Sequence, residues 1–478
     1  MRYLKYSTLL SYFSRILIFS LSLFYIILFS ILQICKFNNF EPSCYLVGWI
    51  SYSAWNLFAH GSFQILPAIL PKLSIFFLFM PLNLFCFFLP PAPEILLILQ
   101  NIIIMLTVIP LYLLANYLLK SRALAFALSL TFLLNPIIHF ASISGFTLEI
   151  VALPSLMFAF YYLEKGNLNK AFVFVILASM CRISVLIMNL LWGLCIFFTG
   201  KNRKFGKDVF LVNFIWLLSS LIIFFFLKQH PILRELFHLE QYGDNLQGVI
   251  QKLLNSPSIL LDHALNRENL YILLNISLPL AFTPLLRPII LLPLVFSFTY
   301  ILFLHNNTPE LCFILPFIYL SAIYGAKKII AWKPNKQKLK YTLTVSLIVL
   351  SLISHYYLHL PWHSPIPFSK DANWGYYRLT KHNEVGHKFL KLIPQEASVL
   401  AQHPLEQYLY RRTKLDMLTR GSTEKDWEYI FLDTSAPPNY LTPPDYKSIV
   451  RRLLENNLFQ VLARRDGWLL LKRTQSEQ

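Results

Sequence analysis

The sequence predicts an α-helical membrane protein that crosses the bilayer many times and carries a small α/β domain at its C-terminal end. Of the 478 residues, 56% are hydrophobic and 14% are charged, and the mean hydropathy is +0.53. These values exclude disorder and are too apolar for an ordinary soluble enzyme. Several apolar runs approach the ~20 residues that a helix needs to cross a bilayer. The first run is long and lacks a small-residue cleavage site, which indicates an anchor helix.

The net charge of +18 does not by itself indicate a nucleic-acid partner. Lys and Arg gather in short clusters between apolar runs, as the positive-inside rule predicts for cytoplasmic loops. The clearest cluster lies between Lys201 and Lys207. If inward and outward crossings alternate along the chain and every dense cluster lies on the cytoplasmic side, the chain has about eleven crossings. The N-terminus is then in the cytoplasm and the C-terminus is outside. We therefore expect membrane lipids, and no nucleic acid, as partners.

The predicted multi-pass domain covers residues 1–359 and has two long outer loops, 36–94 and 228–270. Within the first loop, the apolar run 73–89 is punctuated by prolines. We interpret it as a broken interfacial helix, because a full crossing would put Lys120 and Arg122 on the wrong side. The predicted crossings are 11–34, 95–119, 123–143, 149–163, 171–181, 185–199, 209–227, 271–286, 289–304, 311–326 and 341–359.

Residues 360–478 predict a soluble α/β domain on the outer face, because charged residues rise there and apolar runs shorten. A chain of this length can bury its own modest core. Apolar β-branched runs, a helix start after a Pro-Pro pair and the Asp466-Gly467 turn signal indicate the elements. They are two buried strands, Ser398–Ala401 and Tyr429–Asp433, a helix, Tyr446–Asn456, and a hairpin, Gln460–Ala463 with Trp468–Lys472.

Familiar soluble-enzyme motifs are absent from the sequence. With 14 glycines in the whole chain, a glycine-rich nucleotide cradle is not expected. There is no His-Glu-x-x-His, no Cys/His cluster with metal-ligand spacing and no Gly-x-Ser-x-Gly elbow. Hydrolase and NTPase functions of the soluble type are therefore disfavoured, and the motifs predict no metal site.

Sparse polar residues in the predicted outer loops are the remaining candidates for chemistry. Glu149 is the only acid between Glu94 and Glu164. A carboxylate beside a basic residue at a membrane-facing cavity can act as a general base toward an acceptor hydroxyl, while an arginine holds a phosphate bidentately. The candidates are Glu41, Trp55, His60 and Lys72 in the first outer loop, Glu149 in the second, and Arg182 and Ser184 in the third.

Each candidate also has a structural interpretation that the sequence leaves open. Glu149 would serve as the anion at a helix N-terminus, and Arg182 would snorkel to headgroups. Trp55 would anchor the interface. Lys72 would contact headgroups, and Glu41 and His60 would be solvated loop residues.

At these positions the chain resembles an uncharacterised prokaryotic membrane-protein family, domain-of-unknown-function family 2079, which is grouped with the GT-C glycosyltransferases. The resemblance rests on the segment Gly48–Gly61 and on Asn135-Pro136 followed by Gly145–Glu149. Where the family pattern looks like Asp-Phe-His-Pro-Glu, this chain reads Gly-Phe-Thr-Leu-Glu, ending at Glu149. A Lys-Glu-Asp motif appears as Arg182-Ile183-Ser184. Arg287-Pro288, Leu315–Phe317 and parts of the terminal domain fit as well.

The resemblance implies a GT-C-like fold and transfer of a sugar from a polyprenyl-phosphate donor on the outer face of a bacterial inner membrane. It implies Glu149 and Glu41 as catalytic carboxylates, with a divalent cation as a candidate cofactor. Arg182, Ser184, His60, Lys72 and Trp55 would then bind substrate.

Two other functions remain open. The departures from the family's acidic motifs favour a non-catalytic membrane protein that binds lipid or a partner. A transporter is disfavoured, because no inverted repeats or charged, broken helices at the midplane are evident.

Overall fold

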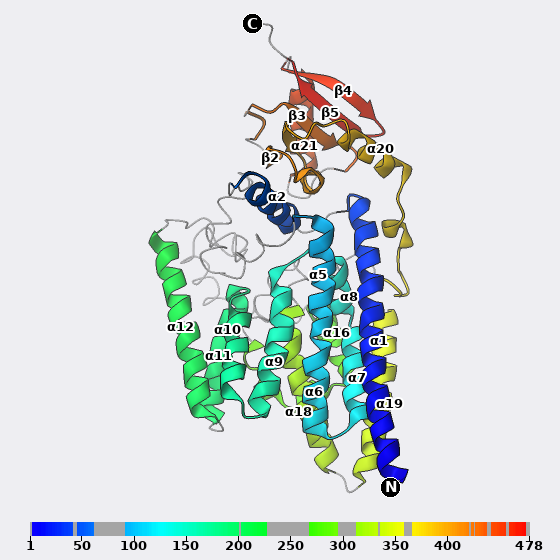
Figure 1. Ribbon diagram of the computed structural model, residues 1–478, viewed down its shortest axis with the longest axis vertical. Coiled ribbons are helices and arrows are strands. Elements are labelled where there is room, and N and C mark those ends of the chain that lie inside the picture. Colours follow the sequence, from blue (N-terminus) through cyan, green and yellow to red (C-terminus); the bar gives the residue numbers. More distant parts are fainter. Residues whose placement is uncertain are drawn as a thin grey trace.

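The computed structural model shows a bundle of helices that carries a domain with a β-sheet at one end (Figure 1). We call this end of the bundle the domain end and the opposite end, where the N-terminus lies, the far end. The structure describes residues 2–41, 45–61, 91–199, 202–226, 267–294, 312–332, 335–357, 366–419, 422–424, 426–436, 441–455 and 458–474.

The bundle consists of helices along its axis and one helix, α2 (Tyr45–His60), that lies across the domain end beneath the C-terminal domain (Figure 1). The other helices are α1 (Arg2–Asn38), α5 (Pro93–Leu106), α6 (Val108–Leu119), α7 (Arg122–Leu133), α8 (Pro136–Ile143), α9 (Ala152–Glu164), α10 (Leu168–Ser179), α11 (Ile183–Thr199), α12 (Arg203–Phe226), α16 (Arg267–Ser277), α18 (Leu315–Trp332) and α19 (Lys336–Tyr357).

Four helical segments are long and apolar enough to cross a membrane: Ile16–Asn38, Pro93–Leu119, Cys312–Trp332 and Lys336–Tyr357. A fifth is the pair α7 and α8, which bends by 47°. The bend follows from Pro136 at the start of α8, where the side chain of Asn135 caps the new helix by accepting from Ile137 N at 2.9 Å. The predicted count of eleven crossings is not confirmed by the described residues and stays a prediction.

The predicted crossing 271–286 is wrong as a continuous helix. α16 ends at Ser277, and three 3₁₀ helices follow: η4 (Leu278–Leu280), η5 (Thr283–Leu286) and η6 (Pro288–Leu291). Each has a proline as its first or second residue, and proline has no N–H for an α-helical hydrogen bond. We call residues 278–294 the broken segment. It packs so closely on α18 that a Cβ added at Gly325 would lie 2.0 Å from the carbonyl oxygen of Thr283.

The C-terminal domain is built on a five-stranded sheet with the order β2-β1-β3-β5-β4. β1 (Ser398–Ala401), β2 (Lys414–Met417) and β3 (Tyr429–Asp433) run parallel, whereas β4 (Phe459–Arg465) and β5 (Trp468–Arg473) pair antiparallel. The predicted strands and hairpin are confirmed, and Asp466 and Gly467 take the positive φ values, 50° and 82°, that its tight turn needs. The predicted helix is present as α21 (Pro443–Glu455), and β2 was not predicted.

The two faces of this sheet have different partners. Leu400, Ile430 and Leu471 face α21 in one core cluster. Phe431 and Trp468 belong to a second cluster that also contains side chains from the domain end of the bundle: Phe37, Phe40, Trp49, Leu97 and Phe146. Strands that are buried on both faces are apolar throughout. The C-terminal domain and the bundle therefore share one continuous core.

The end of α1 is held inside the C-terminal domain by backbone contacts as well as by packing. The Tyr408 hydroxyl donates to the carbonyl oxygen of Phe37, and a ring nitrogen of His387 lies 2.7 Å from the carbonyl oxygen of Asn38. The ring of Phe40 packs between His387 and Trp468, at centroid distances of 4.5 and 4.9 Å. Because the last carbonyls of a helix lack partners within it, these contacts satisfy the end of α1 and fix the domain on it.

Replacing Gly48 in α2 with Ala is expected to loosen the docking of the domain. The added Cβ would lie 2.7 Å from Cγ of Gln407 in the 3₁₀ helix η9 (Leu405–Leu409) and 3.2 Å from its Cα. Overpacking of this kind costs about 1–3 kcal/mol. Hydrogen exchange should rise in α2 and η9. Phe58→Ser, at a side chain that is 59% exposed on the same helix, is the control and should change nothing. Equal exchange in Gly48→Ala and wild type would contradict the close packing.

The predicted sidedness is testable at two exposed positions at opposite ends of the bundle. His60 ends α2 at the domain end, and Asn169 lies in the first turn of α10 at the far end. In a background without native cysteines, a membrane-impermeant thiol reagent should label His60→Cys in intact cells. It should label Asn169→Cys only after permeabilisation. Labelling of both from the same side would refute the topology.

Candidate functional site

The domain end of α8 is held by amide side chains from α1 and α5. Gln100 Nε2 donates to the carbonyl oxygens of Ala141 and Ser144, at 2.5 and 3.0 Å. Gln33 Nε2 also donates to Ser144 O, and its own oxygen accepts from Asn101 Nδ2 at 3.0 Å. Since the last carbonyls of a helix have no partner within it, these buried amides satisfy them away from water. They thereby fix the start of the loop after α8.

This loop carries the acid that the sequence singled out. Phe146 is buried in the core shared with the C-terminal domain and anchors the loop there. The chain then enters the 3₁₀ helix η2 (Leu148–Val151), so the backbone of Glu149 follows directly after the anchored loop. The side chain of Glu149 lies outside the described part of the structure, and so does the whole of Lys72.

Glu41 follows the end of α1 at the same junction and is half-buried. Burial raises the pKa of the Glu41 carboxyl, and the positive charge of Lys36 lowers it in part. Nζ of Lys36 in turn lies 3.5 Å from the carbonyl oxygen of Ile143 at the end of α8. A basic side chain and an acid with a raised pKa therefore stand next to the loop that leads to Glu149.

The structure adds two carboxylates that sequence reasoning did not select. Burial raises the pKa of the Tyr408 hydroxyl well above its usual value, and three nearby carboxylates raise it further. They are Glu406, Glu94 and Glu41. Glu94 lies in the first turn of α5, where the helix dipole favours an anion, and this was the available sequence signal for it. Glu406 lies in η9 and is 1% exposed, and its Oε1 is 2.7 Å from Nδ1 of His403. We call Glu41, Glu94, Glu406 and Tyr408 the junction cluster.

The remaining first-loop candidates lie on α2. Trp55 is half-buried, and the guanidinium of Arg411 lies 5.6 Å from the centre of its ring. Trp55 therefore contacts the C-terminal domain in this structure. His60 is the exposed last residue of the helix. α2 thus brings Trp55 to the junction between bundle and domain and leaves His60 at the surface.

Arg182 and Ser184 lie elsewhere. They occupy the turn between α10 and α11, where Arg182 is half-buried and Ser184 is buried. The Ser184 hydroxyl has no hydrogen-bond partner among the described residues. Figure 1 shows this turn nearer to the middle of the bundle than α2. The described residues therefore do not bring Arg182 and Ser184 beside Trp55 or His60.

The described residues do not fit a divalent cation. No group of three or more His, Cys, Asp or Glu side chains in that part of the chain is arranged to hold a metal ion.

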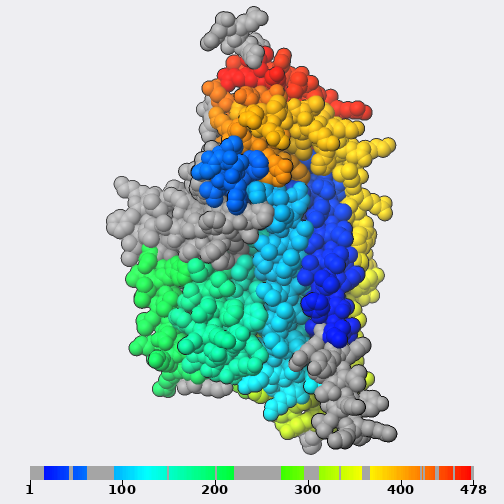
Figure 2. Space-filling view, viewed as in Figure 1, coloured from blue at the N-terminus to red at the C-terminus, as the bar shows by residue number. Residues whose placement is uncertain are grey.

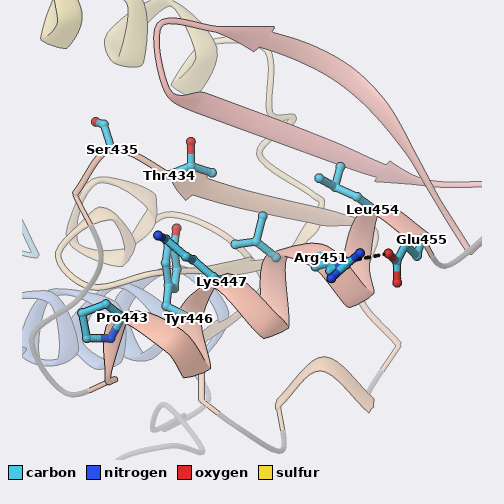
Figure 3. A pocket seen from close by; sticks show the side chains of 9 residues that line it. Thr434, Ser435, Pro443, Tyr446, Lys447, Arg451, Leu454 and Glu455 are labelled. Atoms are coloured by element: carbon cyan, nitrogen blue, oxygen red, sulfur yellow. Dashed lines mark hydrogen bonds and ion pairs between the residues drawn. The ribbon is translucent and has the colours of Figure 1, made fainter.

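The C-terminal domain has a cavity of its own, of about 630 Å³, between α21 and the end of β3 (Figure 3). Thr434 and Ser435 line it from the strand side, and Lys447 lines it from the helix. Arg451 and Glu455 border it and pair with each other at 2.8 Å. The cavity lies within the domain and contains none of the residues predicted from the sequence.

A histidine next to this cavity joins α20 (Lys381–Leu390) to the sheet. His382 Nε2 lies 3.2 Å from Asp433 Oδ2, and Nδ1 lies 3.1 Å from Asp466 Oδ2. Its ring stacks on Trp468 at a centroid distance of 4.9 Å. Burial lowers the pKa of His382, but the hydrogen bonds and charges of the two aspartates outweigh it, so the pKa is raised.

The comparisons with known proteins agree with the combination of bundle and domain. A family model described as a predicted membrane protein, DUF2079, matches residues 40–470. The chain belongs to this family. The match extends from the end of α1 to β5, so it spans both the bundle and the C-terminal domain. No curated protein matches the chain.

Among solved structures, the chain is similar to the oligosaccharyltransferase of Archaeoglobus fulgidus in its apo form. The two share 11% sequence identity, and the likeness covers 87% of this chain and 70% of that chain, with a TM-score of 0.36. A likeness at this level carries no argument about substrate or mechanism.

The raised pKa of His382 predicts a pH-dependent contribution to stability. A histidine that gains acidic partners on folding stabilises the fold fully below its unfolded pKa of about 6.5. The contribution is lost as the pH rises through the raised folded value. The midpoint temperature of thermal unfolding should therefore fall more between pH 6 and pH 9 for wild type than for His382→Gln. An identical fall in both proteins would show that the two aspartates do not stabilise the charged imidazole.

Proposed function

We propose that this protein is a GT-C-like integral membrane glycosyltransferase, or a degenerate relative of one, that transfers a sugar from a polyprenyl-phosphate donor. The observation that carries the proposal is the junction cluster. It gathers Glu41 and Glu94, with Lys36 close by, where α1, α5 and the C-terminal domain meet. Acidic and basic groups at the end of a membrane bundle suit a reaction between a lipid-linked donor and a water-borne acceptor.

The proposed reaction is a displacement at the anomeric carbon of the sugar. The acceptor hydroxyl oxygen forms the new bond to this carbon, and the bond to the phosphate oxygen breaks. The polyprenyl phosphate leaves with the electron pair, and the hydroxyl proton passes to a carboxylate. Glu149 is the candidate base on the fixed loop, and Glu41 is the second candidate. Burial raises the pKa of Glu41, so its carboxylate is a stronger base than a solvated one.

The phosphate of the donor needs positive charge. Arg182 keeps its charge at any physiological pH and can hold a phosphate bidentately. Lys36 and Lys72 supply further positive charge on the same side of the predicted topology. We place this chemistry on the outer face of a bacterial inner membrane, because the domain end carries the predicted outer loops and the C-terminal domain.

A non-catalytic function is the second candidate, and a specific observation favours it. One member of the junction cluster also docks the domain, because the Tyr408 hydroxyl donates to the carbonyl oxygen of Phe37 at the end of α1. This contact fits a protein that uses the junction to bind lipid or a partner. Turnover by the purified protein separates the two functions.

Replacement of the candidate bases tests the proposal. Glu149→Gln and Glu41→Gln should each lower sugar transfer by roughly 100-fold or more, since a positioned base contributes 10²–10⁴-fold. The measurement is transfer from a radiolabelled polyprenyl-phosphate sugar by purified protein in lipid. Glu396→Gln, at an exposed acid of the C-terminal domain, is the control and should keep full activity.

Wild-type activity should also fall as the pH drops through the raised pKa of Glu41. If both variants kept the wild-type rate, neither carboxylate would be the base. If the wild type transferred no sugar from any such donor, the non-catalytic function would stand.

A further inference from the structure

A second cavity lies in the bundle, at the far end. It has a volume of about 520 Å³ and opens between the end of α9, α11, α18 and the 3₁₀ helix η6. Most of its wall is apolar, from Phe160, Leu163, Trp192, Ile196, Ile289 and Leu320. Its charged lining residues are Glu164 and Arg287, and its uncharged polar lining includes Tyr324, Thr199 and Asn202. None of them belongs to the proposed transfer site.

The broken segment explains why a cavity forms here. Backbone that is not α-helical is tolerated at membrane depth only where protein buries it or where it lines a cavity. Ser321 Oγ on α18 lies 2.7 Å from the carbonyl oxygen of Pro284 and 3.0 Å from that of Arg287. Gly325, one turn along, lets Thr283 approach α18 closely. These contacts hold Arg287 and Ile289 at the cavity instead of within a regular helix.

The two charged residues of this cavity carry opposite charges and form no ion pair with each other within the described residues. Glu164 accepts a hydrogen bond from the Tyr324 hydroxyl. Arg287 is exposed and forms no ion pair or hydrogen bond through its side chain within the described residues. A ligand that enters the cavity therefore meets an anionic group, a cationic group and an apolar wall.

The apolar wall continues onto the surface of the bundle. Ile289 lines the cavity and is 53% exposed, and Leu292, in the same segment, is 54% exposed. Lys165 at the end of α9 lies 4.6 Å from the ring of Tyr161, and Lys327 lies 5.8 Å from the ring of Tyr324. Lys and Tyr pairs at the end of apolar helices are typical of the level of lipid headgroups. The cavity is thus placed where a phospholipid can enter sideways.

We propose that this cavity binds a zwitterionic phospholipid with a primary amine in its headgroup. The lipid ammonium donates hydrogen bonds to Glu164, the phosphate is held by Arg287, and an acyl chain lies along Ile196 and Ile289. A phospholipid without an amine can still place its phosphate at Arg287, but it leaves the Glu164 carboxylate without a cationic partner. A quaternary amine has no N–H to donate. The site therefore selects a primary amine over both.

Native mass spectrometry of the full-length protein with defined lipids tests the proposal. Phosphatidylethanolamine, phosphatidylglycerol and phosphatidylcholine with identical acyl chains are the probes. Wild type should retain phosphatidylethanolamine about tenfold better than either of the others, since a hydrogen bond between charged groups contributes about 1.5–3 kcal/mol. Glycerophosphoethanolamine, which has the headgroup without acyl chains, should not compete. Competition by it would overturn the assignment to a membrane lipid in favour of a soluble phosphate.

Two variants separate the two charged contacts. Glu164→Gln can still accept from Tyr324, so the bundle should remain folded, but the preference for phosphatidylethanolamine over phosphatidylglycerol should vanish. Arg287→Gln should weaken both of these lipids about equally. Lys165→Gln, at an exposed residue of the same end that does not line the cavity, is the control and should keep the wild-type preference.

Equal retention of the three lipids by wild type would overturn the proposal. The proposal would also be overturned if Glu164→Gln unfolded at the same temperature as wild type and kept the wild-type preference for phosphatidylethanolamine over phosphatidylglycerol. Neither result bears on sugar transfer, because the site lies at the end of the bundle opposite to the junction cluster.

Discussion

The insertion of the end of α1 into the C-terminal domain is the contact on which the rest of the domain end depends. Phe37 and Phe40 lie in one core with the sheet residues Phe431 and Trp468. The Tyr408 hydroxyl reaches the backbone of the same short stretch. A shared core with backbone hydrogen bonds moves as one body, because interiors are close-packed and transmit displacement. The space-filling view shows α2 and the C-terminal domain seated on α1 and α5 (Figure 2).

This rigid junction explains how sparse polar groups become a site. Gln33, Gln100 and Asn101 would each be costly in an apolar bundle without partners. Gln33 and Gln100 donate to Ser144 O at the end of α8, and Asn101 donates to Gln33, so these contacts fix the loop that leads to Glu149. The acids of the junction cluster are brought near Tyr408 by α1, α5 and η9, three elements that are distant in sequence. The site is thus a product of docking and not of any local motif.

The far end follows a different rule. There the prolines of the broken segment prevent a continuous α-helix, and α18 accommodates the resulting irregular backbone through Ser321 and Gly325. Two ends of one bundle therefore have different chemistry. The domain end gathers carboxylates between elements, whereas the far end exposes one acid and one arginine to an apolar cavity. The proposed sugar transfer and the proposed lipid binding would thus use opposite ends of the bundle.

The sequence by itself determined the class of protein, several of its helices and much of the C-terminal sheet. Apolar runs and charge clusters report directly on the bilayer, and the alternation around the Asp466-Gly467 turn reports on a local hairpin. It also contained segments that resemble the family whose model matches residues 40–470. These features depend on residues that are close together in the chain, so they can be predicted from the sequence alone.

Only the tertiary structure decided which polar groups meet. Nothing local to Glu94 or Glu406 indicates that both lie near Glu41, because the three come from separate elements joined by the docking of the C-terminal domain. The crossing predicted for 271–286 was wrong for a related reason. Its apolar run indicates a continuous helix, whereas its prolines indicate breaks, and the sequence alone does not show which signal prevails. The folded chain resolves that conflict in favour of the prolines, because a missing backbone donor cannot be replaced by burial, whereas an apolar side chain packs equally well on an irregular backbone.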